Sequence, residues 1–239
     1  MVLRAFSLRP SLRSLLDAIF PPRCYGCDVE IERGLVCAVC HAQLMSGRLG
    51  VCSGCGRPLV GGSAECGRCA VPFAPLAVRA LGRYAPPYSG LVHALKYDGK
   101  EQLAQLLGAA LARLVESDPD LSSADCVCPV PLHPARRRER GYNQSALLAE
   151  EVASATGIRL VDGLARRRNT RTQTALADDR ARQHNMRGAF APRAGFRGDG
   201  MRFVLLDDVT TSGATLDAAA RQLLKAGAGS VFGLVVAAA

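Results

Sequence analysis

One segment near the C-terminal end joins two acids to a run of hydroxyl-bearing residues. An apolar stretch from Phe203 to Leu206 leads directly into Asp207 and Asp208, and the chain then reads VTTSGAT as far as Thr215. Where a strand turns into a helix in this way, several backbone N–H groups point together toward the helix N-terminus and can bind a phosphate monoester. The two acids can accept hydrogen bonds from ribose hydroxyls close to that phosphate.

The turn itself supplies further donors for an anion. Its candidate residues are Thr210, Thr211, Ser212, Gly213, Ala214 and Thr215. Gly213 permits a close approach of the backbone to a ligand. The alternative is a hydroxyl-capped helix after a buried strand, with both acids merely solvated. The two commonest nucleotide loops do not compete, because the chain contains neither G-x-x-x-x-G-K-[ST] nor G-x-G-x-x-G.

Arginines gather in two further segments. PVPLHPARRRERGYNQ, from Pro129 to Gln144, follows a predicted strand and contains Arg136, Arg137, Arg138 and Arg140. Guanidinium groups bind phosphates through paired donors, so a pyrophosphate leaving group is a candidate ligand, and a solvated basic loop is the alternative. Residues 166–200 are polar and rich in arginine, and we expect a long loop that closes over a charged substrate.

Eight of the ten cysteines form four C-x2-C pairs, separated by 9, 11 and 10 residues. The pairs are Cys24 with Cys27, Cys37 with Cys40, Cys52 with Cys55, and Cys66 with Cys69. Two such turns complete the tetrahedral thiolate shell of Zn2+, so four pairs predict two zinc sites rather than disulfides or an iron–sulfur cluster. Sequential pairing is the default, and a crossed arrangement fits the spacing nearly as well. A full shell leaves no open position, so both sites are expected to be structural.

The hydrophobic pattern predicts an α/β fold with a parallel sheet flanked by helices. Strands are expected over 76–84, 125–132, 202–206 and 231–236, and helices over 89–97, 103–114, 145–156 and 215–226. Prolines in residues 71–75 indicate a linker. We therefore predict an amphipathic helix over 1–22, a double zinc ribbon over 23–72, and one larger domain over 73–239. Cys126 and Cys128 are expected to be small core residues.

Composition narrows the class of protein. Hydrophobic residues make up 49% of the 239 residues, which is typical of a globular chain. No apolar run reaches the length of a membrane span and no signal peptide is recognisable, so we expect a cytoplasmic protein without membrane insertion. The net charge of +9 is smaller once metal-bound cysteines count as thiolates, and it favours phosphate-bearing partners.

Taken together, these motifs resemble the ComF family. The resemblance runs from Leu15 to the C-terminus and rests on the cysteine pairs, LKYDGKEQLAQLLG, PVPLHPARRRERGYNQS, RRRNTRTQTAL and LLDDVTTSGATL. The last segment is similar to the signature of type I phosphoribosyltransferases, which bind 5-phosphoribosyl pyrophosphate (PRPP) with Mg2+. ComF proteins combine a double zinc ribbon with such a domain and are associated with competence and DNA uptake.

The resemblance implies a site and a reaction. It implies that Asp207 and Asp208 hold the ribose hydroxyls, that the turn of Thr210, Thr211, Ser212, Gly213, Ala214 and Thr215 holds the 5-phosphate, and that PRPP reacts by pentosyl transfer. We interpret Arg136 as a further PRPP-binding residue, and Arg138 and Arg140 as catalytic residues beside the two acids. The alternatives are a non-catalytic sensor of the phosphoribosyl group, a protein that binds single-stranded DNA, and a ribbon that recruits DNA-uptake proteins.

Overall fold

A five-stranded parallel sheet forms the centre of the protein in the computed structural model, which describes residues 21–52, 56–59, 66, 73–169 and 184–239. The strand order is β1-β7-β6-β2-β3, and every neighbouring pair is parallel. The strands are β1 (Val78–Arg83), β2 (Cys126–Pro129), β3 (Arg159–Leu160), β6 (Arg202–Thr210) and β7 (Ser230–Ala238). The predicted α/β class with a parallel sheet is confirmed.

Alternating side chains of the central strand β6 pack into two separate hydrophobic cores, one on each face of the sheet. Val204 and Leu206 pack into one core, and Phe203 and Leu205 pack into the other. Successive side chains of a strand point to opposite faces, so an uninterrupted apolar run is what a strand covered on both faces requires. The pattern places Asp207 and Asp208 where this buried run reaches the carboxyl edge of the sheet.

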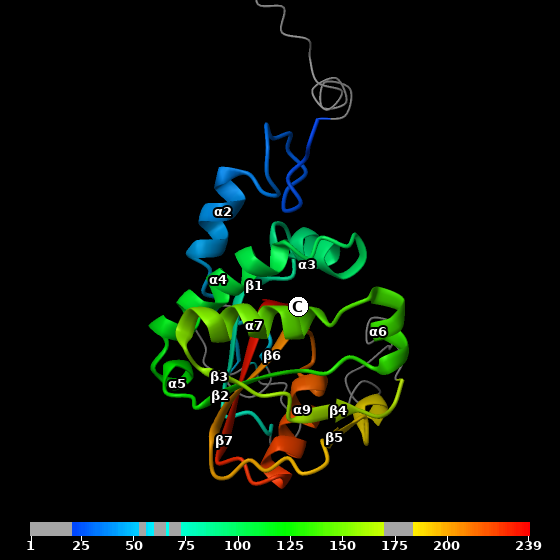
Figure 1. The fold of residues 1–239 in the computed structure, drawn as a ribbon. Helices are drawn as coiled ribbons and strands as arrows, with labels where there is room; N and C mark the ends of the chain where they lie inside the picture. The colour runs from blue at the N-terminus through cyan, green and yellow to red at the C-terminus, as the bar shows by residue number, and fades with distance from the viewer. Residues whose placement is uncertain (1–20, 53–55, 60–65, 67–72, 170–183) are drawn as a thin grey trace, which may run out of the picture.

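Helices cover both faces of the sheet, as Figure 1 shows. Helices α3 (Tyr88–Tyr97), α4 (Leu103–Ser117) and α7 (Gln144–Thr156) lie over one face, and α9 (Ala214–Lys225) lies over the other. The side chain of Asn143 caps the start of α7, and Gly157 ends that helix in a left-handed conformation with φ of 74°. The short helix α5 (Pro119–Ser122) follows α4.

Two segments differ from the sequence-based expectation. The arginine-rich run does not form a loop but the helix α6 (Pro134–Arg140), which begins where His133 Nδ1 accepts a hydrogen bond from the Ala135 N–H. The stretch over 166–200 is not wholly irregular either, because β4 (Leu164–Arg166) pairs antiparallel with β5 (Phe190–Pro192). Strands of three residues are too short to show a hydrophobic alternation in the sequence. Residues 170–183 lie outside the described part of the chain.

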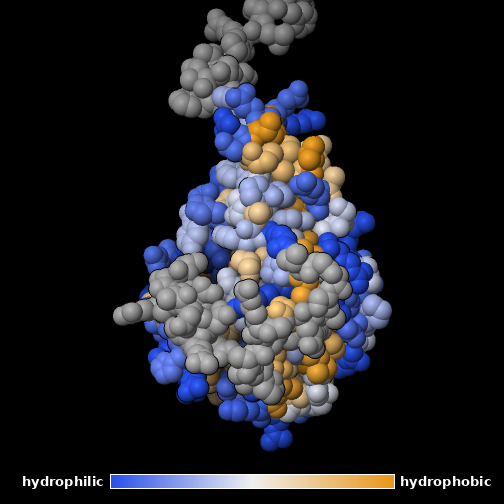
Figure 2. All heavy atoms as spheres, turned by 180° about the vertical axis from the view of Figure 1, so that it is seen from behind, coloured by the Kyte–Doolittle hydropathy of each residue, from blue (hydrophilic) through white to orange (hydrophobic). Residues whose placement is uncertain are grey.

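The cysteine-rich segment packs directly on the larger domain. Its helix α2 (Ala38–Met45) buries Leu44 in the core that α3 and α4 share, and the Tyr88 hydroxyl donates to the Gln43 carbonyl at 3.1 Å. The backbone N–H of Leu49 donates to Ala80 on β1 at 2.9 Å. Figure 2 shows hydrophobic atoms at the surface near the top of the described part of the molecule. Val29 and Val39 of the cysteine-rich segment are exposed.

The N-terminal helix predicted over 1–22 lies outside the described residues apart from its last two positions, and the predicted domain boundaries stay predictions. Among the described helices, none is long and apolar enough to cross a membrane.

Candidate functional site

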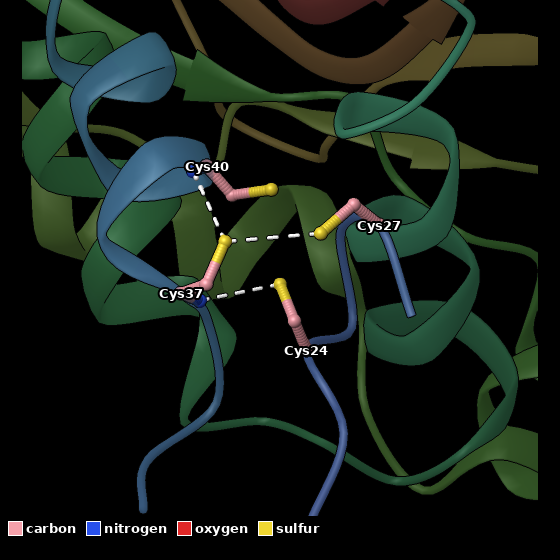
Figure 3. Close-up of side chains that lie close together, drawn as sticks. All are labelled: Cys24, Cys27, Cys37 and Cys40. Atoms are coloured by element: carbon pink, nitrogen blue, oxygen red, sulfur yellow. Dashed lines mark hydrogen bonds between the residues drawn. The ribbon is translucent and has the colours of Figure 1, made fainter. Parts of the chain in front are cut away.

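The first two cysteine pairs converge on one point, as Figure 3 shows. One ligand atom from each of Cys24, Cys27, Cys37 and Cys40 lies within 4.8 Å of all the others. The Cys37 N–H donates to Cys24 Sγ at 3.2 Å, and the Cys40 N–H donates to Cys37 Sγ at 3.4 Å, so the backbone orients the sulfurs. The sequential pairing of these two knuckles is therefore confirmed, and the set suits a structural zinc ion.

The described cysteines of the third and fourth pairs, Cys52 and Cys66, also lie close together. The Cys66 N–H donates to Cys52 Sγ at 3.4 Å, and Gly56, just after the third pair, adopts a positive φ of 73° that favours glycine. Cys55 and Cys69 lie outside the described residues. Cys126 and Cys128 are fully buried core residues, as predicted. Burial raises the pKa of Cys128 to about 12, so its thiol stays protonated.

The acid pair sits at the carboxyl end of β6 and is almost completely buried. Asp207 is 8% exposed and Asp208 is 3% exposed. The Ser145 hydroxyl at the start of α7 donates to Asp207 Oδ1 at 2.8 Å, and the Asp208 N–H donates to the same oxygen at 2.9 Å. From α3, Lys96 Nζ lies 2.7 Å from Asp208 Oδ1. Three elements distant in sequence thus fix the two carboxylates.

Burial beside a second acid shifts the pKa of Asp207. Burial, with Asp208 adding repulsion, raises the pKa of Asp207 from 3.8 to about 7, although Lys96 and Ser145 oppose the shift. Burial alone would lower the pKa of Lys96, but the Asp208 carboxylate outweighs burial and the net pKa is raised. The lysine is therefore an ammonium at neutral pH, and it offsets part of the charge of the pair.

The turn after the acids has the form that the sequence predicted. Gly213 adopts a left-handed conformation (φ 75°), and α9 begins at the next residue without a side-chain cap. Two buried polar atoms of this region, Asp208 Oδ2 and Ser212 Oγ, have no hydrogen-bond partner among the described residues. A buried polar atom without a partner is costly, so such atoms indicate a place for a ligand.

A cavity of about 190 Å³ opens between the acids and the turn. We call it the diacid cavity. The sequence-predicted residues that line it are Arg136, Arg140, Asp207, Asp208, Thr210, Thr211, Gly213, Ala214 and Thr215. Ser212 is buried beneath this lining, and Arg138 lines a different cavity.

Helix α6 divides its arginines between two cavities. Arg136 and Arg140, four positions apart, face the diacid cavity, whereas Arg137 and Arg138 line a second cavity. The separation follows from helical geometry, because Arg136 and Arg140, four positions apart, share one face of the helix, and Arg138 lies on roughly the opposite face. The sequence showed the density of arginines but not this division.

Several residues of the diacid cavity were not identified from the sequence. They are Lys96, Tyr97, Asn143, Gln144, Ser145 and Arg166. The available signal was the polar character of helix ends, since LKY closes α3 and NQS opens α7. Arg140 also extends over the Tyr97 ring, with its guanidinium carbon 5.1 Å from the ring centroid.

Two family models match the chain. The double zinc ribbon domain matches residues 15–70, and the phosphoribosyl transferase domain matches residues 143–239.

Relatives of known name match most of the chain. DNA utilization protein YhgH of Salmonella typhimurium is 34% identical over 88% of this chain and 94% of its own. The protein of the same name from Escherichia coli is 31% identical over the same shares. Competence protein F of Haemophilus influenzae is 30% identical over 86% of this chain and 92% of its own.

A solved structure of glutamine PRPP amidotransferase from B. subtilis, complexed with ADP and GMP, is similar to part of the fold. The match has a TM-score of 0.35 and 23% identity, and it covers 57% of this chain and 26% of that one.

Proposed function

The chain belongs to the ComF family of competence-associated proteins, which carry a double zinc ribbon and a phosphoribosyltransferase domain, and from this premise we propose that it binds PRPP in the diacid cavity. In this proposal the 5-phosphate lies at the turn of Thr210, Thr211, Ser212, Gly213, Ala214 and Thr215. The ribose hydroxyls lie at Asp207 and Asp208. The protein acts in the cytoplasm, in the uptake or use of DNA that the names of its relatives describe.

The observation that carries the proposal is the pair of unsatisfied buried atoms. Asp208 Oδ2 is an acceptor without a donor, and Ser212 Oγ can donate or accept. A ribose hydroxyl satisfies the first and a phosphate oxygen satisfies the second, and both groups belong to one phosphoribosyl moiety. A strand followed by a capped helix does not require a second buried acid, and Asp208 has a buried oxygen without a hydrogen-bond donor.

The residues fit a pentosyl transfer. The bond between C1 of the ribose and the pyrophosphate oxygen breaks, the pyrophosphate leaves with the electron pair, and a nucleophilic atom of the acceptor forms the new bond to C1. Arg136 and Arg140 lie on the wall of the cavity that faces the acids, where their charge stabilises the departing pyrophosphate. Asp207 and Asp208 orient the ribose through its hydroxyls and stabilise positive charge at C1.

The donor set also fits Mg2+, because carboxylate oxygens and diphosphate oxygens are the ligands that this ion prefers. When bound with PRPP, Mg2+ neutralises charge on the pyrophosphate and makes it a better leaving group. Lys96 holds Asp208 in place through their ion pair and offsets part of the negative charge of the acids.

The second candidate is a binding protein without turnover, which senses the phosphoribosyl group or engages single-stranded DNA and DNA-uptake proteins. The arginines of α6 favour an interaction with phosphates. Proteins that bind single-stranded DNA usually stack its bases on aromatic side chains. Only 5% of the residues of this chain are aromatic and none is Trp, which speaks against DNA binding of that kind.

Calorimetry of the zinc-loaded protein with PRPP and Mg2+ tests the proposal. The double variant D207N/D208N should lose saturable binding, whereas the control E32Q/E150Q, which removes two exposed acids, should bind as the wild type does. Absence of binding by the wild type would contradict the proposal and leave DNA binding as the better reading. If PRPP binds, pyrophosphate release in the presence of candidate acceptors separates a transferase from a sensor.

A further inference from the structure

A second cavity lies on the other side of α6 from the acids. Its volume is about 600 Å³, and four of its lining residues are Arg137, Arg138, Arg166 and Arg193. They come from three separate elements: α6, the hairpin strand β4, and the chain just after β5. We call it the arginine cavity. The other lining residues are uncharged, so within the described part of the chain no carboxylate lines this cavity.

The charge of this cavity is only partly balanced by the protein. Within the described part of the chain, neither Arg137 nor Arg138 forms an ion pair, and both are exposed. Arg193 pairs with Asp162 at 2.7 Å, but both side chains are about half exposed and such pairs contribute little. Converging guanidinium groups repel one another, and an oxyanion bound between them removes that repulsion.

Arg166, one of the four arginines, lies over an aromatic ring. The guanidinium carbon of Arg166 lies 5.4 Å from the centroid of the Phe190 ring, on the neighbouring strand β5. Arg166 lines both the arginine cavity and the diacid cavity, as do Pro131 and Leu132. These three residues form a shared wall, so anions in the two cavities would bind side by side without occupying the same space.

We propose that the arginine cavity is a second oxyanion site, which takes a phosphate or diphosphate group that is not part of the PRPP bound at the acids. The chemistry suits a phosphate ester of a small ligand, such as a phosphorylated acceptor or effector, and it equally suits the phosphodiester of a nucleic-acid strand. The site is distinct from the proposed PRPP site, because neither Asp207 nor Asp208 lines it, and Arg166, whose charge acts on Asp207, is the arginine that the two cavities share.

Two probes distinguish these sources, inorganic pyrophosphate and a short oligothymidylate without a terminal phosphate. Each is titrated into protein already saturated with PRPP and Mg2+, so that the diacid cavity is occupied. The test variant is R137Q/R138Q. The matched control is R33Q/R113Q, which removes two exposed arginines elsewhere and leaves the net charge of the two variants equal. A further variant, R193Q, changes the cavity from a different element.

We expect at least one probe to bind the saturated wild type, with the dissociation constant raised about tenfold or more in R137Q/R138Q and less in R193Q. The R33Q/R113Q control should match the wild type. Binding of pyrophosphate identifies a small phosphate ligand, and binding of the oligonucleotide alone identifies a strand. PRPP affinity should be unchanged in R193Q, and probe binding should survive D207N/D208N. The proposal would be overturned if R137Q/R138Q and the control R33Q/R113Q lost probe affinity equally, or if neither probe bound the wild type.

Discussion

Lys96 Nζ lies 2.7 Å from Asp208 Oδ1, so helix α3 places a cation against the acid pair at the end of β6. The lysine side chain is 19% exposed and the Asp208 side chain is 5% exposed. The same helix end is fixed by the Tyr142 hydroxyl, which donates to the Leu95 carbonyl. Without the ammonium group, the two buried carboxylates would lose the cation that pairs with Asp208.

Replacing Lys96 by Met is therefore expected to destabilise the protein in a pH-dependent way. Removing one partner of a buried pair costs about 3–5 kcal/mol, because the remaining charge is left uncompensated. The loss should be greatest above about pH 8 and should shrink toward about pH 5, where Asp207 holds a proton and less negative charge is left uncompensated. Chemical denaturation at several pH values measures it.

The exposed Lys225 offers a matched control, since K225M removes the same charge without a buried partner. Its free energy of unfolding should stay within about 0.5 kcal/mol of the wild type. An equal, pH-independent loss in K96M and K225M would show that the pair does not stabilise the fold.

Asp207 predicts a second pH effect, of opposite sign to that of an ordinary acid. Its pKa is raised to about 7, so between its ordinary pKa of 3.8 and about 7 the folded protein holds a proton that the unfolded chain has lost. Raising the pH through this window therefore lowers stability. The ligand-free D207N variant should become more stable than the wild type as the pH rises to about 8, by an amount on the order of a few kcal/mol.

Denaturation of both proteins without ligand measures this difference. A constant difference between about pH 5 and about pH 8 would mean that Asp207 titrates normally and that its burial is compensated. The variant should at the same time lose affinity for PRPP, which separates the stability of the site from its proposed function.

The sequence predicted the parts of the site that are continuous in the chain. The apolar run to Leu206, the acid pair and Gly213 follow one another, so strand, turn and helix could be recognised from local pattern alone. The first zinc cluster could be predicted for a similar reason, because C-x2-C spacing fixes both sulfurs of a turn.

The remaining parts depend on tertiary packing. Lys96 belongs to the amphipathic helix α3, and only the docking of that helix on the sheet brings it to Asp208. The separation of Arg136 from Arg138 required α6 to be a helix, whereas its composition favoured a solvated loop. Charged helices without buried residues leave no hydrophobic period from which they could be predicted.

Gly90 on α3 allows the first zinc knuckle to approach that helix. A Cβ atom at this position would lie 2.2 Å from the backbone oxygen of Tyr25, between Cys24 and Cys27. Ala is normally the better helix former, but a clash with backbone cannot be relieved by a rotamer change. We expect G90A to lower the free energy of unfolding by about 1–3 kcal/mol.

The control for this prediction is G50A, because nothing lies within 4 Å of a Cβ atom placed at Gly50. Its stability should be close to that of the wild type in the same denaturant titration. A neutral or stabilising effect of G90A would mean that the knuckle and α3 do not pack as the structure shows.

Replacing one cysteine of the first cluster is expected to remove the zinc ion from that cluster. Cys37 is the N-cap of α2 as well as a member of the first cluster, so C37S should release one zinc and destabilise the segment that packs Leu44 into the core. C128S changes a buried thiol outside both clusters and should keep the full metal content. Metal analysis of the purified variants measures their zinc content. Unfolding in the presence of a colorimetric zinc indicator measures their stability and the release of zinc.

Since the acid pair is held by Ser145 and Lys96 rather than by the cysteines, C37S should retain saturable PRPP binding at low temperature, where the larger domain stays folded. Unchanged zinc content in C37S would show that these four sulfurs do not hold the ion. Complete loss of PRPP binding in a folded C37S protein would instead show that α3 transmits the state of the zinc knuckle to Lys96, because that helix contacts the knuckle at Gly90 and the acids at its other end.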